Sequence, residues 1–156
     1  MEAAKGAIEM KRTLALILAI LVAFATPAVA ASSQAKKVLS VAKKQIGAPY
    51  KLDSDSPKSF NCFSFVAYCF NEVEPGTITS SGINGPYDTI TSASKLKPGD
   101  IVVFKSNRKL KGIMGYHYAI YAGKGYIIHA ANKADGVTVS RLKDFKKRFV
   151  GAVRIL

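Results

Sequence analysis

The feature that most constrains the fold is a series of short strand-like segments in the C-terminal third of the chain. Five apolar segments follow the Pro-Gly turn of LKPGD, and Gly, Asn, Asp and Lys separate them: IVVF, HYAIYA, GYIIHA, VTVS and FVGAVRIL. Short β-rich runs bounded by turn residues are typical of antiparallel strands joined by tight connections. The pattern predicts an antiparallel sheet from Ile101 to the end of the chain.

Two predicted helices precede this sheet. In SSQAKKVLSVAKKQIGAPY the apolar residues recur at three- and four-residue steps, which predicts an amphipathic helix capped by Ser32 or Ser33 and stopped at Gly47. The run 62–72 is apolar nearly all round and predicts a buried second helix. Residues 75–97 are rich in Gly, Ser and Thr and are expected to form a long surface loop. Helices followed by an antiparallel sheet indicate the α+β class.

The first thirty residues are predicted to be a secretory signal peptide. A basic start at Lys11 and Arg12 precedes the apolar run TLALILAILVAFATPAVA, which ends in a small-x-small exit. An uncleaved membrane anchor is the alternative, since the run approaches the roughly 18 residues that span a bilayer. We expect cleavage because a Thr-Pro pair interrupts the run. Residues 1–30 are then removed, and residues 31–156 form one domain with enough apolar content for a core.

The chain is strongly basic, with a formal net charge of +13. Loss of residues 1–30 removes three basic and two acidic residues from that total, which leaves +12. An excess of positive charge of this size attracts polyanions. In the extracellular space, anionic wall polymers or lipid head groups are more plausible polyanions than nucleic acid. A solvated basic surface that aids solubility is an equally good interpretation of the charge.

Both cysteines, Cys62 and Cys69, belong to the second predicted helix. Seven helical residues separate them by about 10.5 Å along the axis, too far for the Cα separation of about 4.4 to 6.8 Å that a disulfide requires. Cys69 lies mid-helix between aromatic residues, which favours a core position. Cys62 begins the helix, where unpaired N–H groups and the positive end of the dipole favour a thiolate. Cys62 is therefore a candidate nucleophile, with a second buried cysteine as the alternative.

Both histidines, His117 and His129, lie in neighbouring strand-like runs joined by a Gly-Lys-Gly turn. A hairpin at that turn places position 117 opposite about position 130, so the two histidines are near neighbours. A thiol nucleophile needs a base for its proton and a third polar group that orients the base, and this pair fits both roles. A metal site is disfavoured because three ligands at most are present, without CxxC or HExxH spacing. Ordinary packed histidines remain an alternative.

These segments together resemble the NlpC-type cysteine peptidases, which cut the peptide stems of bacterial peptidoglycan. The resemblance covers residues 37–156 and rests on IGAPY, FNCFSFVAY, LKPGDIVVF, YHYAIYAGKGYIIHAAN and GAVRIL in this order. It implies a papain-like α+β fold, in which the helix with the cysteine packs on the sheet with the histidine. The family's usual reaction is hydrolysis of the bond between D-γ-glutamate and a diamino acid, diaminopimelate or lysine, through an acyl-enzyme.

By motif, the resemblance implies that Cys62 is the nucleophile and His117 the base. His129 corresponds to the third polar group, which orients the base. Tyr50, in the family's Pro-Tyr position, is expected to assist the oxyanion through its hydroxyl.

The departures from the family are concentrated beside the cysteine. Family members commonly read Asp-Cys-Ser-Gly there, and the acidic residue and the serine are implicated in binding the free amino group of a stem peptide. This chain has Asn61 without the charge and Phe63 without the hydroxyl. We expect Asn61, Phe63 and Ser64 to shape the substrate-binding side, with the loop 75–97 covering it.

The resulting prediction is a secreted cysteine endopeptidase that acts on peptidoglycan stem peptides, extracellular or wall-associated, or periplasmic where an outer membrane exists. It is expected to be a monomer without cofactor or metal. It is expected to associate with anionic wall polymers by charge, and neither to bind nucleic acid nor to remain inserted in a membrane. The alternatives are a CHAP-like amidase, an acyl-transferring relative and a catalytically inactive wall-binding protein. A basic nucleic-acid binder is the weakest alternative, because no basic recognition helix is recognisable.

Overall fold

The computed structural model describes residues 27–54, 57–107 and 115–155. The unit that carries the features below spans Ser33–Leu156. Residues 1–26, which hold most of the predicted signal peptide, lie outside the described ranges. Among the described helices, none has the length and apolar character needed to cross a membrane.

Two α-helices are described, α2 (Pro27–Lys44) and α3 (Cys62–Asn71). The predicted helix over residues 62–72 is confirmed almost to the residue as α3. After α2, Gly47 has φ +92°, the left-handed conformation expected just after a helix. The predicted start of α2 at Ser32 or Ser33 is wrong, because the helix already begins at Pro27. Proline is favoured at a first helical position, and the alanines that follow it are strong helix formers.

The sheet is six-stranded and antiparallel, with strand order β3-β8-β4-β5-β6-β7. The five strands predicted from the sequence are confirmed with shifts of one or two residues at their ends. The strands are β3 (Tyr87–Ile90), β4 (Ile101–Lys105), β5 (Tyr116–Gly123), β6 (Tyr126–Asn132), β7 (Gly136–Arg141) and β8 (Phe149–Ile155).

The prediction that residues 75–97 form an irregular loop is wrong. The segment contains a small hairpin of β1 (Ile78–Thr79) and β2 (Gly82–Ile83), then β3 and the 3-10 turn η1 (Ala93–Lys95). Strand β3 pairs with β8 at the edge of the sheet. Its first three side chains are exposed, so the apolar alternation that reveals a half-buried strand is absent.

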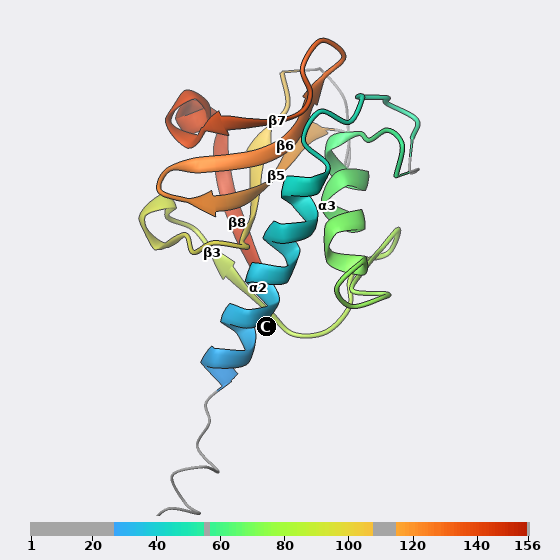
Figure 1. Cartoon of the computed structure of the whole chain (residues 1–156). Helices are drawn as coiled ribbons and strands as arrows, with labels where there is room; N and C mark the ends of the chain where they lie inside the picture. The colour runs from blue at the N-terminus through green and yellow to red at the C-terminus, as the bar shows by residue number, and fades with distance from the viewer. Residues whose placement is uncertain (1–26, 55–56, 108–114, 156) are drawn as a thin grey trace, which may run out of the picture. The chain divides into compact units, whose positions relative to one another are not determined.

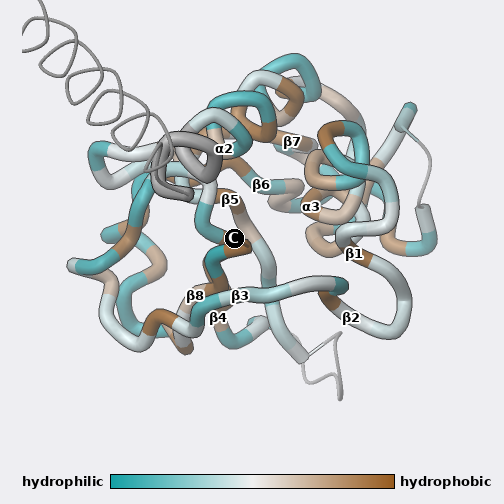
Figure 2. The backbone as a smooth tube through the Cα atoms, turned by 90° about the horizontal axis from the view of Figure 1, so that it is seen from below, coloured by the Kyte–Doolittle hydropathy of each residue, from teal (hydrophilic) through white to brown (hydrophobic). Residues whose placement is uncertain are grey.

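The sheet carries a different layer on each face (Figure 1). Helices α2 and α3 cover one face and form the larger core with β5, β6 and β7. Turn η1 and the 3-10 segment η3 (Leu142–Arg148) pack near a second cluster on the other face. Figure 2 shows the resulting hydropathy pattern, with hydrophilic outer turns around apolar stretches on α3 and the strands. Helix α3 contacts β5 and β6, the two strands that carry His117 and His129.

An ion pair joins Asp100, the residue before β4, to Arg154 on β8. Asp100, which is 1% exposed, accepts hydrogen bonds from Arg154 Nε at 2.8 Å and Nη2 at 2.7 Å, and from the Lys97 N–H at 2.7 Å. Before it, Gly99 has φ +95°, and a Cβ there would lie 2.7 Å from the Cβ of Ala35 on α2. These contacts give a structural role to the Gly-Asp pair of LKPGD.

Candidate active site

The tip of α3 is held by an asparagine cap. Asn61 Oδ1 accepts hydrogen bonds from the N–H groups of Phe63 at 3.0 Å and Ser64 at 2.8 Å. Its Nδ2 donates to the carbonyl of Leu52 at 2.8 Å, which ties the tip to the preceding loop. The cap fixes the position of Cys62, the first residue of the helix and half-buried.

Two residues predicted to shape the substrate-binding side, Asn61 and Ser64, belong to this cap. Ser64 Oγ accepts the Asn61 N–H at 3.0 Å and completes a capping box. Ser64 is not among the residues that line the pocket described below, and its expected part in shaping the substrate-binding side stays a prediction. Asn61 does line the pocket, but its side-chain oxygen and nitrogen are engaged in the cap and the loop.

The two histidines lie on the same face of the sheet, on adjacent strands. Strands β5 and β6 pair with Ile120 opposite Ile128, a register one residue from the one predicted, which makes His129 a diagonal neighbour of His117. His117 Nε2 and His129 Nδ1 lie 2.7 Å apart, so the expected contact is present. His129 is 2% exposed, and the rings meet edge to face with centroids 5.0 Å apart.

The hydrogen-bond chain continues to a serine that the sequence analysis missed. His129 Nε2 lies 2.9 Å from Ser140 Oγ on β7. If His117 is to accept a proton at Nδ1, its Nε2 carries hydrogen and donates to His129 Nδ1. His129 then carries hydrogen at Nε2 and donates to Ser140 Oγ. The chain from Ser140 to His117 is thus fully hydrogen-bonded in the tautomer that leaves Nδ1 available for a nearby thiol.

Aromatic rings and one cation surround the histidine pair. The ring of Phe145, on η3, stacks on His117 at 6.2 Å and meets His129 edge to face at 5.2 Å. Burial, with smaller contributions from His129 and Arg148, lowers the pKa of His117 to about 3. Burial and Arg148 lower the pKa of His129 to about 4, although Asp135 acts in the opposite direction. Both imidazoles are therefore neutral at physiological pH.

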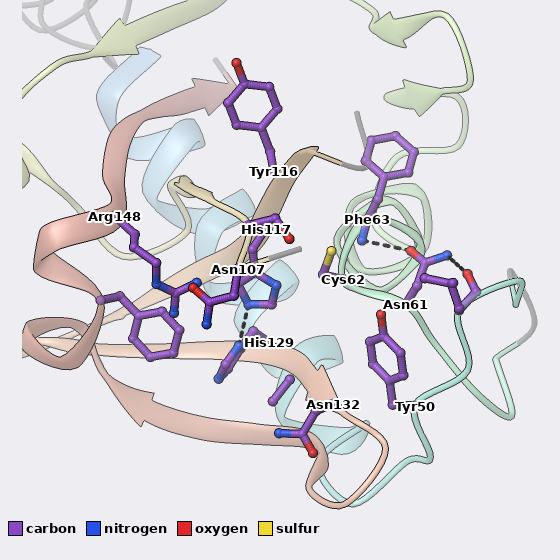
Figure 3. Close-up of a pocket in the computed structure, with 14 residues that line it drawn as sticks. Tyr50, Asn61, Cys62, Phe63, Asn107, Tyr116, His117, His129, Asn132 and Arg148 are labelled. Atoms are coloured by element: carbon purple, nitrogen blue, oxygen red, sulfur yellow. Dashed lines mark hydrogen bonds between the residues drawn. The ribbon is translucent and has the colours of Figure 1, made fainter. Parts of the chain in front are cut away.

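A single pocket brings together the tip of α3 and the histidine pair (Figure 3). Cys62 lies on one side of it and His117 on the facing side, while the Tyr50 hydroxyl points toward the tip of α3 (Figure 3). Phe63 also lines the pocket, with its ring edge to face against Tyr118 at 5.6 Å. The pocket is lined by Tyr50, Leu52, Asn61, Cys62, Phe63, Ser106, Asn107, Tyr116, His117, His129, Ala131, Asn132, Phe145 and Arg148.

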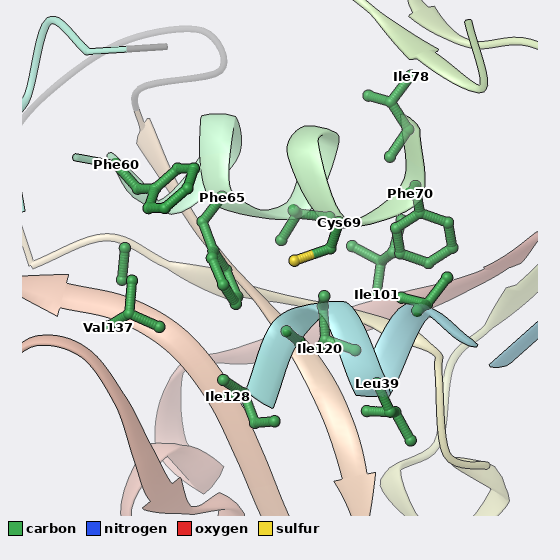
Figure 4. Close-up of a cluster of buried hydrophobic side chains, with 14 residues drawn as sticks. Leu39, Phe60, Phe65, Cys69, Phe70, Ile78, Ile101, Ile120, Ile128 and Val137 are labelled. Atoms are coloured by element: carbon green, nitrogen blue, oxygen red, sulfur yellow. The ribbon is translucent and has the colours of Figure 1, made fainter. Parts of the chain in front are cut away.

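The other cysteine is part of the core. Cys69 is fully buried among the apolar side chains between α3 and the sheet (Figure 4). Burial, with a smaller contribution from Glu72, raises the pKa of its thiol to about 12. Both cysteines are free thiols in the structure. The chain thus has one unreactive thiol in its core and one at a pocket.

Other predicted features fall outside this pocket. No described residue between 75 and 97 lines it, so the expectation that this segment covers the site is not supported. Within the described ranges, no group of three or more His, Cys, Asp or Glu side chains is placed to hold a metal ion.

Several residues that line the pocket were not predicted from the sequence. Phe145 and Arg148 come from η3, a 3-10 segment in LKDFKKR that has no apolar period. Asn107 follows strand β4, and Asn132 is the last residue of β6. Ser140 had a usable signal, because VTVS alternates and a tight turn after Asn132 places its polar positions on the face of His129.

Comparison with known proteins agrees with this geometry. A model of the NlpC/P60 family matches residues 47–154. LytE of Bacillus subtilis, a probable peptidoglycan endopeptidase, is 32% identical over 125 residues, which are 79% of this chain and 35% of LytE. The gamma-DL-glutamyl hydrolase of the same organism is 27% identical over 150 residues, which are 90% of this chain and 36% of that protein. The chain spans about a third of the length of these two curated relatives.

Solved structures give the same assignment. The NlpC/p60 domain of the peptidoglycan hydrolase SagA aligns with a TM-score of 0.59 and 27% identity over 76% of this chain and 97% of that domain. The α+β arrangement, with a helix-tip thiol facing a histidine pair on the sheet, defines a papain-like domain. Within that class, the chain belongs to the NlpC/P60 family.

Proposed function

We propose that this protein is an exported cysteine endopeptidase that hydrolyses the peptide stems of peptidoglycan at the D-γ-glutamyl–diamino acid bond. One observation carries the proposal: Cys62 and the hydrogen-bonded pair His117 and His129 line one pocket. The similarity to a peptidoglycan endopeptidase and to a gamma-DL-glutamyl hydrolase supports the choice of substrate. Export rests on the signal-peptide pattern of residues 1–30.

The proposed reaction begins with transfer of the Cys62 proton to Nδ1 of His117. This is the ring nitrogen left for the thiol, because Nε2 contacts His129. The sulfur attacks the γ-carbonyl of the glutamyl residue, and the Tyr50 hydroxyl donates to the oxyanion that forms. His117 returns the proton to the departing amine, which leaves a thioester on Cys62.

Hydrolysis of the thioester completes the cycle. His117 takes a proton from water as the water oxygen attacks the carbonyl, and the tetrahedral intermediate expels the Cys62 thiolate, which the His117 imidazolium protonates. The released γ-carboxylic acid loses its proton to bulk water. His129 orients the imidazole through both halves of the reaction by accepting the Nε2 hydrogen. The strand pairing of β5 with β6 holds the two rings in this relation.

Digestion of purified peptidoglycan tests the proposal. The parent protein should release fragments with a new D-γ-glutamyl carboxyl terminus and a new amino terminus on the diamino acid, both visible by mass spectrometry. Cys62→Ala should release none, whereas Cys69→Ala, a matched control in the core, should keep the cleavage specificity. Equal digestion by Cys62→Ala would disprove the mechanism, and cleavage at the sugar–peptide junction would identify an amidase instead.

Association with anionic wall polymers is part of the proposal. The net charge of +12 expected after removal of residues 1–30 supports it. Retention on insoluble wall material should weaken between about 0.05 and 0.5 M salt, because salt screens exposed charges. Salt-independent retention would argue against an electrostatic contact.

A further inference from the structure

The charges around the candidate active site are unbalanced. Of the pocket-lining residues, Arg148 alone has a permanently charged side chain, and none is Asp or Glu within the described ranges. The position before the nucleophile, often acidic in the family, is the neutral Asn61, whose amide is engaged in the helix cap. The pocket therefore suits an anionic group better than an ammonium group.

The guanidinium of Arg148 is held in place at the pocket. Its Cζ lies 4.8 Å from the centroid of the Phe145 ring, and Nη1 donates to the carbonyl of Lys105 at 3.2 Å. In Figure 3 the side chain extends from η3 toward Asn107 and the histidine pair. These contacts orient the guanidinium fork, which leaves most of its five N–H donors for another partner.

No protein carboxylate neutralises this cation in the described part of the chain. The ion pair found there joins Arg154 to Asp100. The charge of Arg148 instead acts on the imidazoles, since it contributes to the lowered pKa of both His117 and His129. That effect opposes formation of the imidazolium that the proposed reaction requires. A bound anion would offset it at the moment of catalysis.

We propose that Arg148 binds the free α-carboxylate of the γ-linked glutamyl residue on the acyl side of the scissile bond. The inference rests on the proposed function. A γ-linkage consumes the side-chain carboxyl of glutamate, so the α-carboxylate remains ionised near the scissile carbonyl unless it is amidated. A guanidinium pairs with a carboxylate through two parallel N–H···O bonds, a geometry that the neutral amide cannot reproduce. Arg148 thus selects the unamidated stem peptide.

Two matched peptides test this inference. γ-D-glutamyl-lysine is compared with its α-amide, γ-D-isoglutaminyl-lysine, for the parent protein, for Arg148→Gln and for the control Arg141→Gln. Arg141 is exposed, carries the same charge and does not line the pocket. The parent and Arg141→Gln should prefer the free carboxylate by about 10- to 100-fold in kcat/KM, the range of a charge-assisted hydrogen-bonded pair. Arg148→Gln should reduce that preference to about twofold or less.

Binding to Cys62→Ala, measured by calorimetry, gives a readout that needs no turnover. The free carboxylate should bind at least tenfold more tightly than the α-amide, and the difference should vanish in Cys62→Ala combined with Arg148→Gln. Amidation of the lysine carboxyl should change affinity little, which separates the two carboxylates of the peptide. Equal affinity for both glutamyl forms, or a preference that survives Arg148→Gln, overturns the inference. Failure of the parent to cleave either peptide while this binding difference persists counts against the proposed function alone.

Discussion

Removal of the Ser140 hydroxyl should slow the reaction while leaving substrate binding in the pocket nearly unchanged. Ser140 Oγ accepts the His129 Nε2 hydrogen in the tautomer chain, and Ser140 does not line the pocket. One neutral hydrogen bond contributes about 1 kcal/mol net, so Ser140→Ala should lower kcat/KM about fivefold. The loss should fall on kcat with KM nearly unchanged. Ser140→Thr, which keeps the hydroxyl, should recover most of the activity.

Two readouts separate positioning from general damage. The nitrogen NMR signals of His129 should show more of the Nδ1–H tautomer in Ser140→Ala. Thr138→Ala removes a hydroxyl from the same strand and face, opposite His129 in the register, and should retain full activity. Activity of Ser140→Ala within twofold of the parent, or an equal loss in Thr138→Ala, would refute the tautomer argument.

The free energy of unfolding should depend on pH through the two histidines and on the ion pair of Asp100. Because His117 and His129 have pKa values of about 3 and about 4 in the folded chain, below the usual 6.5, they favour the fold when neutral. The stability they contribute is present above about pH 6.5 and is lost as pH falls toward 4, on the order of a few kcal/mol. Urea unfolding at pH 7 and pH 4.5 should show this loss of unfolding free energy. The double variant His117→Asn with His129→Asn should lose much less between the two pH values. An equal loss in the parent and in the double variant would contradict the assignment. Asp100→Asn should destabilise by about 3 kcal/mol in the same assay, because it breaks a buried pair, whereas the exposed Asp88→Asn should cost under about 0.5 kcal/mol. Similar values for both aspartates would remove the structural role given to Asp100.

Strand alternation and short turns were sufficient to predict most of the sheet. The pairing of β5 with β6 follows from the Gly-Lys-Gly turn, so the meeting of His117 and His129 was predictable from chain position. The start of α3 at Cys62 was predicted from the apolar run 62–72, and the structure adds Asn61 as its N-cap. These are local signals, and the main catalytic candidates depend on them.

Other parts of the site depend on contacts distant in sequence. Phe145 and Arg148 reach the pocket through a 3-10 segment without apolar period, so no local pattern marks them as neighbours of the histidines. Strand β3 was not predicted from the sequence, because an edge strand with exposed side chains lacks the alternation of apolar and polar residues. Ser64 was predicted to shape the substrate-binding side from its place two residues after Cys62, and its hydroxyl accepts the Asn61 N–H in the helix cap.

The proposed mechanism depends on transfer of the Cys62 thiol proton to His117. Alkylation by iodoacetamide at neutral pH, followed by mass spectrometry of the modified peptide, measures the reactivity of that thiol directly. We expect Cys62 in the parent protein to react at least tenfold faster than Cys62 in His117→Ala, while the buried Cys69 stays unmodified in both folded proteins. Equal rates for Cys62 with and without the imidazole would contradict it.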